Sequence, residues 1–220
     1  WFTEANMNAP SRVLDIGCYN GIATCFLAKY YPDCEFIGID ISENSIKVAR
    51  ELAIKLGVKN VTFQRMNAFE VHNAYSNYFD MVISVRSLHE ILGGFTALRS
   101  WSIKDFGNNK IVKEQIGEMT KILNALVTGG GQLVAFERLL SDVDVASFIK
   151  MLNLSGLCVN ESISSMISFH EVSNQEIMPA LVFEKKLTQY TQSMISSMQY
   201  AIYAKKIYLY QSTVQLMKDF

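Results

Sequence analysis

Short apolar, β-branched runs alternate with helix-like stretches along most of this chain. The runs cover residues 12–16, 35–40, 61–66, 80–85 and 132–137, and amphipathic stretches separate most of them. This alternation is typical of a parallel sheet with helices on both of its faces. The order of the segments therefore predicts an α/β fold.

Composition agrees with a globular core. The chain has 220 residues, of which 50% are hydrophobic and 19% charged, so a disordered or collagen-like chain is excluded. Lys and Arg number 20 and Asp and Glu 21, and the net charge of −1 offers no overall attraction to nucleic acid or an anionic membrane. Since no apolar run reaches about 18 residues and no signal peptide opens the chain, we expect neither a membrane helix nor export.

The four cysteines follow no metal-binding spacing. They stand at positions 18, 25, 34 and 158, without a Cys-x-x-Cys pair or a His-x-x-x-His pair to complete a zinc site. We therefore expect no metal site and no disulfide framework. Free thiols fit a reducing compartment, and the predicted location is the cytoplasm.

Sequence patterns typical of helices lie between most of the predicted strands. Apolar residues at helical spacing predict helices over 22–31, 43–56, 110–126 and 142–154. Ser42 is a candidate N-cap of the second helix, and Gly57 supplies a left-handed stop after it. The C-terminal part of the domain is predicted to contain strands at 159–168 and 180–186, joined by a polar loop that holds Pro179.

The last residues differ in character from the rest. Residues 187–220 carry an amphipathic face rich in Tyr and Met, which predicts a helical extension after a domain of residues 1–186. Such a face could dock on its own domain, on a second copy of the chain as a homodimer, or on a neighbouring domain.

The stretch Val13–Gly21, VLDIGCYNG, is the most informative one in the sequence. A strand ends in the acid Asp15 and is followed by a glycine turn and a helix, so a ligand can approach the backbone closely. The dinucleotide fingerprint GxGxxG fails, because Tyr19 and Ile22 occupy its second and third glycine positions. A purely structural turn is the alternative interpretation.

Polar residues also follow the next two strands. Asp40 ends the second strand, where a carboxylate can accept both hydroxyls of a ribose. Its alternative role is a helix cap, but Ser42 already offers one. After the third strand, Asn67 offers an amide to an adenine edge, and Phe69 could stack on a base or simply pack.

The fourth strand leads into a His-Glu pair, His89-Glu90. Ligands of open α/β sheets bind at the carboxyl ends of the strands, so this pair is expected near a cofactor site. His89 is the candidate general base, with Glu90 or Tyr19 beside it, because imidazole titrates near neutral pH. A helix N-terminal histidine without a catalytic role is the alternative.

The order and spacing of these four motifs resemble the class I S-adenosylmethionine-dependent methyltransferases over about residues 10–186. The resemblance implies a Rossmann-like three-layer α/β/α sandwich, with a mostly parallel seven-stranded sheet whose last strand is antiparallel. It also implies S-adenosyl-L-methionine as cofactor and S-adenosyl-L-homocysteine as product. Tyr19 departs from the family pattern, which often has glycine there, and the departure implies either a tighter loop around the methionine moiety or weaker cofactor binding.

The resemblance also implies which residues form the site. The catalytic candidates are His89 and Glu90. The cofactor-binding candidates come from the four motifs and are Asp15, Gly17, Cys18, Tyr19, Gly21, Asp40, Ile41, Asn67, Ala68, Phe69, Ser84, Val85 and Arg86. No metal ligand is among them.

Motifs that are absent from the sequence limit the classes of methyl acceptor that we expect. No Asn-Pro-Pro-Tyr, Asp-Pro-Pro-Tyr or Pro-Cys sequence follows the fourth strand, so methylation of DNA is not expected. We expect a small-molecule acceptor, with Trp1, Phe2, Phe95, Trp101 and Phe106 as candidate residues of its pocket or as satellite core. The alternatives are a non-catalytic methyltransferase-like interaction domain, an RNA or protein methyltransferase, and a nucleotide-dependent oxidoreductase.

Overall fold

The computed structural model describes residues 10–93, 110–139, 142–160, 162–171 and 174–185. The predicted extension 187–220 and the five candidate aromatic residues of the acceptor pocket lie outside the described residues. The predicted boundary between residues 186 and 187, and the predicted contacts of the extension, stay predictions.

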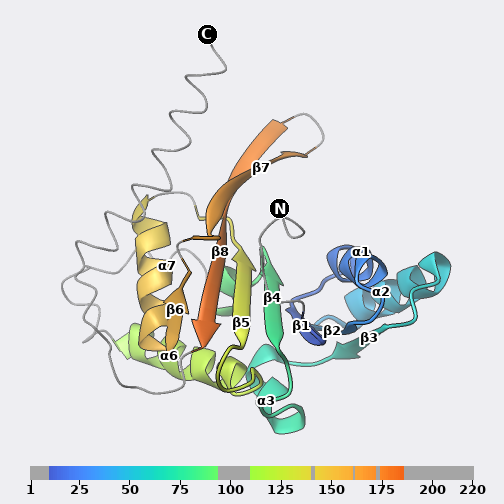
Figure 1. Ribbon diagram of the computed structural model, residues 1–220, viewed down its shortest axis with the longest axis horizontal. Coiled ribbons are helices and arrows are strands. Elements are labelled where there is room, and N and C mark those ends of the chain that lie inside the picture. The colour runs from blue at the N-terminus through green and yellow to red at the C-terminus, as the bar shows by residue number, and fades with distance from the viewer. Residues whose placement is uncertain (1–9, 94–109, 140–141, 161, 172–173, 186–220) are drawn as a thin grey trace.

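The described elements alternate between strands and helices in sequence order (Figure 1). The strands are β1 (Arg12–Ile16), β2 (Glu35–Asp40), β3 (Val61–Arg65), β4 (Met81–Val85), β5 (Gln132–Phe136), β6 (Leu157–Val159), β7 (Ser165–Glu171) and β8 (Asn174–Lys185). The helices are α1 (Ile22–Tyr30), α2 (Glu43–Leu56), the 3-10 helix η1 (Ala68–Glu70), α3 (Val71–Ala74), α4 (Leu88–Ile91), α6 (Lys110–Leu123) and α7 (Asp142–Leu154).

The strands form one sheet in the order β3-β2-β1-β4-β5-β8-β6. Strands β1 to β5 pair in parallel, whereas β8 runs antiparallel to β5, β6 and β7. The predicted α/β class and the mostly parallel sheet with an antiparallel strand are confirmed. Since β1 has β2 on one side and β4 on the other, the order in which strands are added to the sheet reverses between β1 and β4. Ligands bind at such a switch point in open α/β sheets.

The sheet has eight strands rather than the seven expected, because the sixth strand of the expected fold is split into β6 and β7. Ser164 lies in the break, where its N–H and its hydroxyl both bond the carbonyl oxygen of Asn160, at 3.1 and 2.7 Å. The backbone N–H of Val182 donates to Ser164 Oγ at 3.0 Å. A serine hydroxyl thus replaces a strand-to-strand bond at the break.

The prediction of a loop around Pro179 was wrong, since this residue lies inside β8 and is opposite Met166 of β7. The last pair between β5 and β8 is Phe136 with Ala180, so Pro179 comes just beyond the end of β5. Proline is tolerated where a strand has lost a neighbour, because its missing N–H breaks no ladder bond there.

Helices cover both faces of the sheet, and alternate strand residues point to opposite faces. Leu14 and Ile16 belong to a cluster that includes buried residues of α6 and α7. Val13 packs instead with Leu27 and Ala28 of α1. The three layers expected from the sequence are therefore present in the described residues.

The ends of α2 are those that the sequence predicted. Ser42 Oγ accepts the backbone N–H of Ser45 at 3.2 Å, and Gly57 has a left-handed φ of 66°. Because these signals depend on neighbouring residues only, the sequence is enough to place them.

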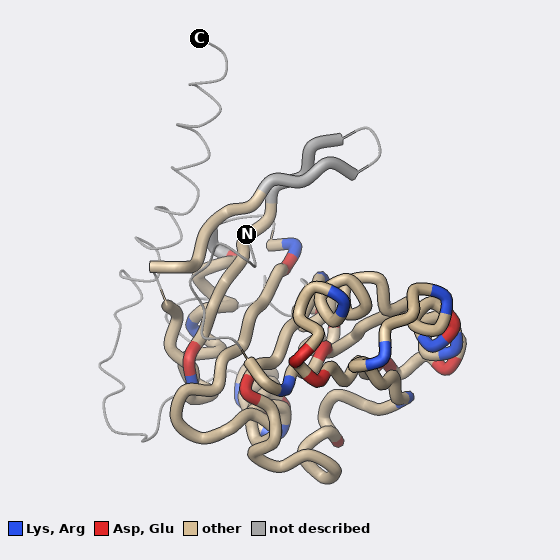
Figure 2. The backbone as a smooth tube through the Cα atoms, turned by 45° about the vertical axis from the view of Figure 1, so that its right-hand side comes forward, with Lys and Arg blue, Asp and Glu red and all other residues tan. Residues whose placement is uncertain are grey.

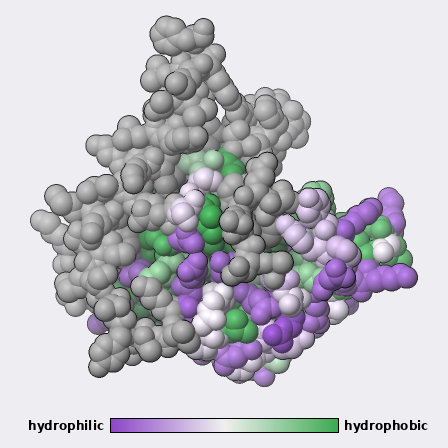
Figure 3. Space-filling model, in the orientation of Figure 1, coloured by the Kyte–Doolittle hydropathy of each residue, from purple (hydrophilic) through white to green (hydrophobic). Residues whose placement is uncertain are grey.

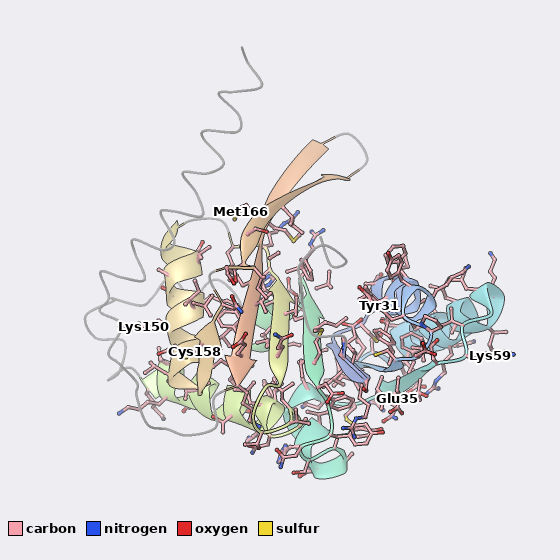
Figure 4. All side chains as sticks on the ribbon, viewed as in Figure 1. Tyr31, Glu35, Lys59, Lys150, Cys158 and Met166 are labelled. Carbon is pink, nitrogen blue, oxygen red and sulfur yellow. The ribbon has the colours of Figure 1, made fainter. Side chains whose placement is uncertain are left out.

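The cysteines are free among the described residues. Three of the cysteines, Cys18, Cys25 and Cys34, are buried on the side of α1. The fourth, Cys158, lies with Lys150 at the β6–α7 end of the molecule, far from Tyr31 and Glu35 in Figure 4. No group of three or more His, Cys, Asp or Glu in the described ranges could hold a metal ion.

Candidate active site

A cavity of about 640 Å³ lies at the carboxyl ends of β1, β2, β3 and β4. The walls are formed by residues that follow or end these four strands, which are Gly17, Tyr19, Ile39, Asp40, Ile41, Met66, Asn67, Ala68, Phe69, Val85, Arg86, Ser87, Glu90 and Ile91. Its volume falls within the roughly 300–1,000 Å³ that is usual for small-molecule sites.

Gly17 allows β1 and the loop after β4 to approach each other at the cavity. Its φ is 67°, and a Cβ placed on it would lie 2.6 Å from Ser87 Cβ. Ser87 Oγ donates to the carbonyl oxygen of Ile16 at 2.5 Å, which holds the two segments together. A side chain at position 17 would be both strained and obstructed.

Other members of the glycine-rich motif lie behind the cavity wall. Asp15 is buried and accepts a hydrogen bond from Thr24 Oγ1 at 2.5 Å. The pKa of Asp15 is raised to about 6, chiefly by burial; the hydrogen bond from Thr24 opposes this rise and the charge of Asp40 adds to it. Gly21 has a φ of 74° and is the N-cap residue of α1. Cys18 is buried, and burial raises the pKa of its thiol. These three residues support the turn and do not line the cavity.

Asp40 lines the cavity and is half-buried. Its Oδ2 accepts the backbone N–H of Tyr19 at 3.0 Å, and its Oδ1 accepts that of Ser42 at 2.8 Å. Each carboxylate oxygen can accept more than one hydrogen bond. The carboxylate is therefore fixed in place and chemically able to accept the hydroxyls of a ribose.

Asn67 is the N-cap residue of the 3-10 helix η1, at the β3 side of the cavity. Its Oδ1 accepts the backbone N–H of Phe69 at 3.0 Å, so the carbonyl that the sequence assigned to adenine also caps this helix. Ala68 and Phe69 line the same wall, together with Ile41 and Met66. This wall is mainly apolar, as a base-binding wall is expected to be.

The segment after β4 forms the opposite wall. Val85, Arg86, Ser87 and Glu90 line the cavity there. Arg86 has a φ of 59°, and its backbone N–H donates to the carbonyl oxygen of Phe136 at 2.7 Å. A positive φ is uncommon outside glycine, and such strained residues cluster at functional sites.

A buried carboxylate, Glu137, organises the start of α4. Ser84 Oγ donates to Glu137 Oε1 at 2.5 Å, and the backbone N–H of Leu88 donates to the same oxygen at 3.1 Å. The other oxygen contacts His89 Nδ1 and accepts the His89 backbone N–H at 3.3 Å. Sequence reasoning missed Glu137, although this acid directly follows the apolar strand β5.

His89 does not lie in the cavity wall. Only 3% of its surface is exposed, and its Nε2 is 3.9 Å from Glu90 Oε1. Glu90 itself lines the cavity, and 77% of its side chain is exposed. Of the two catalytic candidates, the structure thus brings Glu90 to the cavity and places His89 behind it.

The structure brings together most of the predicted cofactor residues. Those that line the cavity are Gly17, Tyr19, Asp40, Ile41, Asn67, Ala68, Phe69, Val85 and Arg86. Those that do not are Asp15, Cys18, Gly21 and Ser84. Ile39, Met66, Ser87 and Ile91 line it without having been predicted, because neighbouring polar residues carried the sequence signal.

Charge on the described surface is mixed. Figure 2 shows Lys and Arg interleaved with Asp and Glu along α2, rather than a stripe of one sign. The charged cavity residues are Asp40, Arg86 and Glu90. Within the described part of the chain, no helix combines the length and hydrophobicity needed to span a bilayer.

Curated proteins match this chain over part of their length. An uncharacterised protein of Rickettsia prowazekii is 23% identical over 163 residues, which are 74% of this chain and 51% of that protein. A tRNA (guanine-N(7)-)-methyltransferase of Chloroflexus aggregans is 35% identical over 82 residues, which are 37% of this chain and 35% of that protein. Ribosomal RNA small subunit methyltransferase G of Bacteroides fragilis is 37% identical over 76 residues, covering 34% of this chain and 35% of that protein.

Solved structures share the fold. A SAM-dependent methyltransferase from Aquifex aeolicus superposes with a TM-score of 0.54 and 17% identity, covering 83% of this chain and 86% of that chain. The (4+2)-cyclase SpnF superposes with a TM-score of 0.57 and 15% identity, covering 82% and 77% of the two chains. The fold is therefore shared with a protein that is named as a cyclase and not as a methyltransferase.

A family model decides the assignment. The family described as a methyltransferase domain matches residues 8–194, which include every strand and helix described above. This chain therefore belongs to the class I S-adenosylmethionine-dependent methyltransferases.

Proposed function

We propose that this domain transfers the methyl group of S-adenosylmethionine to a small-molecule acceptor. The observation that carries the proposal is a cavity whose walls are formed by segments from four neighbouring strands, with Asp40 at the end of β2 and Glu90 beyond β4. Four free thiols among the described residues support the cytoplasmic location proposed from the sequence.

The residues of the β2 and β3 ends fit the nucleoside part of the cofactor. Asp40 would accept the ribose hydroxyls, since two backbone N–H groups already hold its carboxylate in place. The apolar surfaces of Ile41 and Phe69 would cover the adenine, and the Asn67 amide would meet its edge. When bound, S-adenosylmethionine supplies an electrophilic methyl group on a positively charged sulfur.

The methyl acceptor would bind at the β4 side of the cavity. Glu90 lines the cavity and could take a proton from an acceptor hydroxyl or amine as the nucleophile forms. His89 would act as a positioning residue, because its ring lies between the carboxylates of Glu90 and Glu137. Fixing the nucleophile in line with the methyl group and excluding water would supply several kcal/mol of rate enhancement.

Calorimetric titration tests the proposal. We expect S-adenosylmethionine and S-adenosylhomocysteine to bind with micromolar dissociation constants and NADH not to bind. Loss of binding in Asp40→Ala, but not in the exposed-acid control Asp33→Ala, would locate the ligand at the cavity. Failure of both adenosyl ligands to bind would contradict the proposal and favour a non-catalytic interaction domain. Binding of NADH alone would favour an oxidoreductase.

Methylation of RNA is a second candidate function. It is favoured by the tRNA and ribosomal RNA methyltransferases among the relatives, whose matches cover 37% and 34% of this chain. The mixed charges of the cavity favour the small-molecule acceptor instead. Incubation with methyl-labelled S-adenosylmethionine separates the two, since label would enter either transfer and ribosomal RNA or a small-molecule extract.

A further inference from the structure

Tyr19 occupies a backbone conformation that usually requires glycine. Its φ is 49°, and it follows Cys18 in a turn closed by a 2.9 Å bond from the Gly21 N–H to the Cys18 carbonyl oxygen. Its own N–H is held by Asp40 Oδ2 at 3.0 Å. A bulky residue persists in the left-handed region only where its surroundings enforce it, and such residues concentrate at functional sites.

The side chain of Tyr19 lies at the cavity and is mostly exposed. It lines the cavity wall, and 66% of its surface is accessible, so packing in the protein core does not explain its aromatic ring. Figure 3 shows the α1–α2 end of the molecule as a hydrophilic surface interrupted by hydrophobic residues. Ile41, which follows Asp40, is the other large apolar residue of the wall with a similar exposure, 69%.

The order of the strands places Tyr19 in the middle of the cavity. It follows β1, and β1 lies between β2, which ends in Asp40, and β4, which leads to Glu90. If Asp40 holds the ribose and Glu90 faces the acceptor, the sulfur of the cofactor must lie between them. Tyr19 is the aromatic residue of the cavity lining that comes from the turn after this central strand.

We propose that the ring of Tyr19 lies against the sulfonium of bound S-adenosylmethionine and lets the site distinguish the charged substrate from the neutral product. The inference rests on the proposed function, because it needs the cofactor in this cavity. Aromatic faces attract cations, and the attraction disappears when the sulfur becomes an uncharged thioether after methyl transfer. Tyr19 would thereby favour release of S-adenosylhomocysteine.

The test compares the affinities of the two ligands in substituted proteins by calorimetry. Tyr19→Leu removes the aromatic face and should weaken binding of S-adenosylmethionine about fivefold. The affinity for S-adenosylhomocysteine should change by less than twofold. Tyr19→Phe keeps the face and should keep the wild-type ratio of the two dissociation constants. Tyr19→Gly suits the left-handed turn and should lose the discrimination as well, so a folding defect of the leucine variant would not decide the result.

Ile41→Ala serves as the matched control, because it removes an apolar wall residue without an aromatic ring. It should weaken both ligands by the same factor. Equal losses for both ligands in Tyr19→Leu and Tyr19→Gly would overturn the sulfonium contact and leave the proposed function standing. Wild-type protein that binds neither ligand would overturn the proposed function and this inference together.

Discussion

The ring of His89 contacts the fully buried carboxylate of Glu137 through Nδ1, although 48 residues separate them in the sequence. The same carboxylate accepts the hydroxyl of Ser84 and the backbone N–H groups of Leu88 and His89. One acid directly after β5 thus fixes the start of α4, and with it the position of Glu90.

Replacing Glu137, which does not line the cavity, should lower the stability of the protein. Glu137→Gln keeps the size of the side chain but removes its charge and one acceptor, so the free energy of unfolding should fall by about 1–3 kcal/mol. Urea denaturation measures this change. The exposed-acid variant Glu184→Gln should change stability by less than about 0.5 kcal/mol. An equal effect of the two substitutions would contradict the role of Glu137.

Asp40→Ala should weaken binding of S-adenosylhomocysteine by about 1–3 kcal/mol, since it removes charged hydrogen bonds to the ribose. Titration calorimetry gives the affinity. Because Asp40 also accepts the N–H groups of Tyr19 and Ser42, circular dichroism must show that the variant is folded. An unchanged dissociation constant would remove Asp40 from the cofactor site.

Gly17→Ala should cost more stability than Gly57→Ala. Both glycines have a left-handed φ, 67° and 66°, so both substitutions carry a backbone penalty of about 1–2 kcal/mol. Only at Gly17 would the new Cβ meet a neighbour, Ser87 Cβ at 2.6 Å, whereas nothing lies within 4 Å at Gly57. Denaturation midpoints of the two variants test the difference, and equal midpoints would show that Ser87 moves away at no cost.

Asp15 should make the protein less stable at high pH. Burial raises its folded-state pKa from 3.8 to about 6, so the folded protein holds this proton more tightly than the unfolded chain does. The resulting stabilisation is complete below about pH 4 and is lost as pH rises through about 6. Between pH 5 and 8, the wild type should lose about 1 kcal/mol more than Asp15→Asn. Parallel stability curves in urea would contradict the shift.

Substitution at Glu90 should lower turnover rather than cofactor binding. If Glu90 takes the acceptor proton, Glu90→Gln should reduce kcat by about 100-fold on an acceptor that must lose a proton. His89→Ala should lower turnover less and shift the pH profile, because it disturbs the neighbouring carboxylate. Cofactor affinity should stay within twofold in both. Normal turnover in Glu90→Gln would exclude it as the base.

Local sequence patterns were enough to predict much of the fold. The ends of α2 at Ser42 and Gly57 depend on backbone groups within a few residues. Asp40 ends β2 and Asn67 comes shortly after β3, where the sequence predicted them. The alternation of apolar runs and helices then allows few arrangements other than a parallel sheet. This is why the class of fold and most of the cavity wall could be predicted.

Tertiary structure decided what depends on distant partners. The break between β6 and β7 needs Ser164 to meet Val182, and the strand position of Pro179 depends on where β5 ends. His89 is buried because pairing of β4 with β5 brings Glu137 to it, and no local pattern encodes that contact. Sequence by itself thus determined which residues gather at the carboxyl edge of the sheet. Packing across the sheet decided that Glu90 faces the cavity and His89 does not.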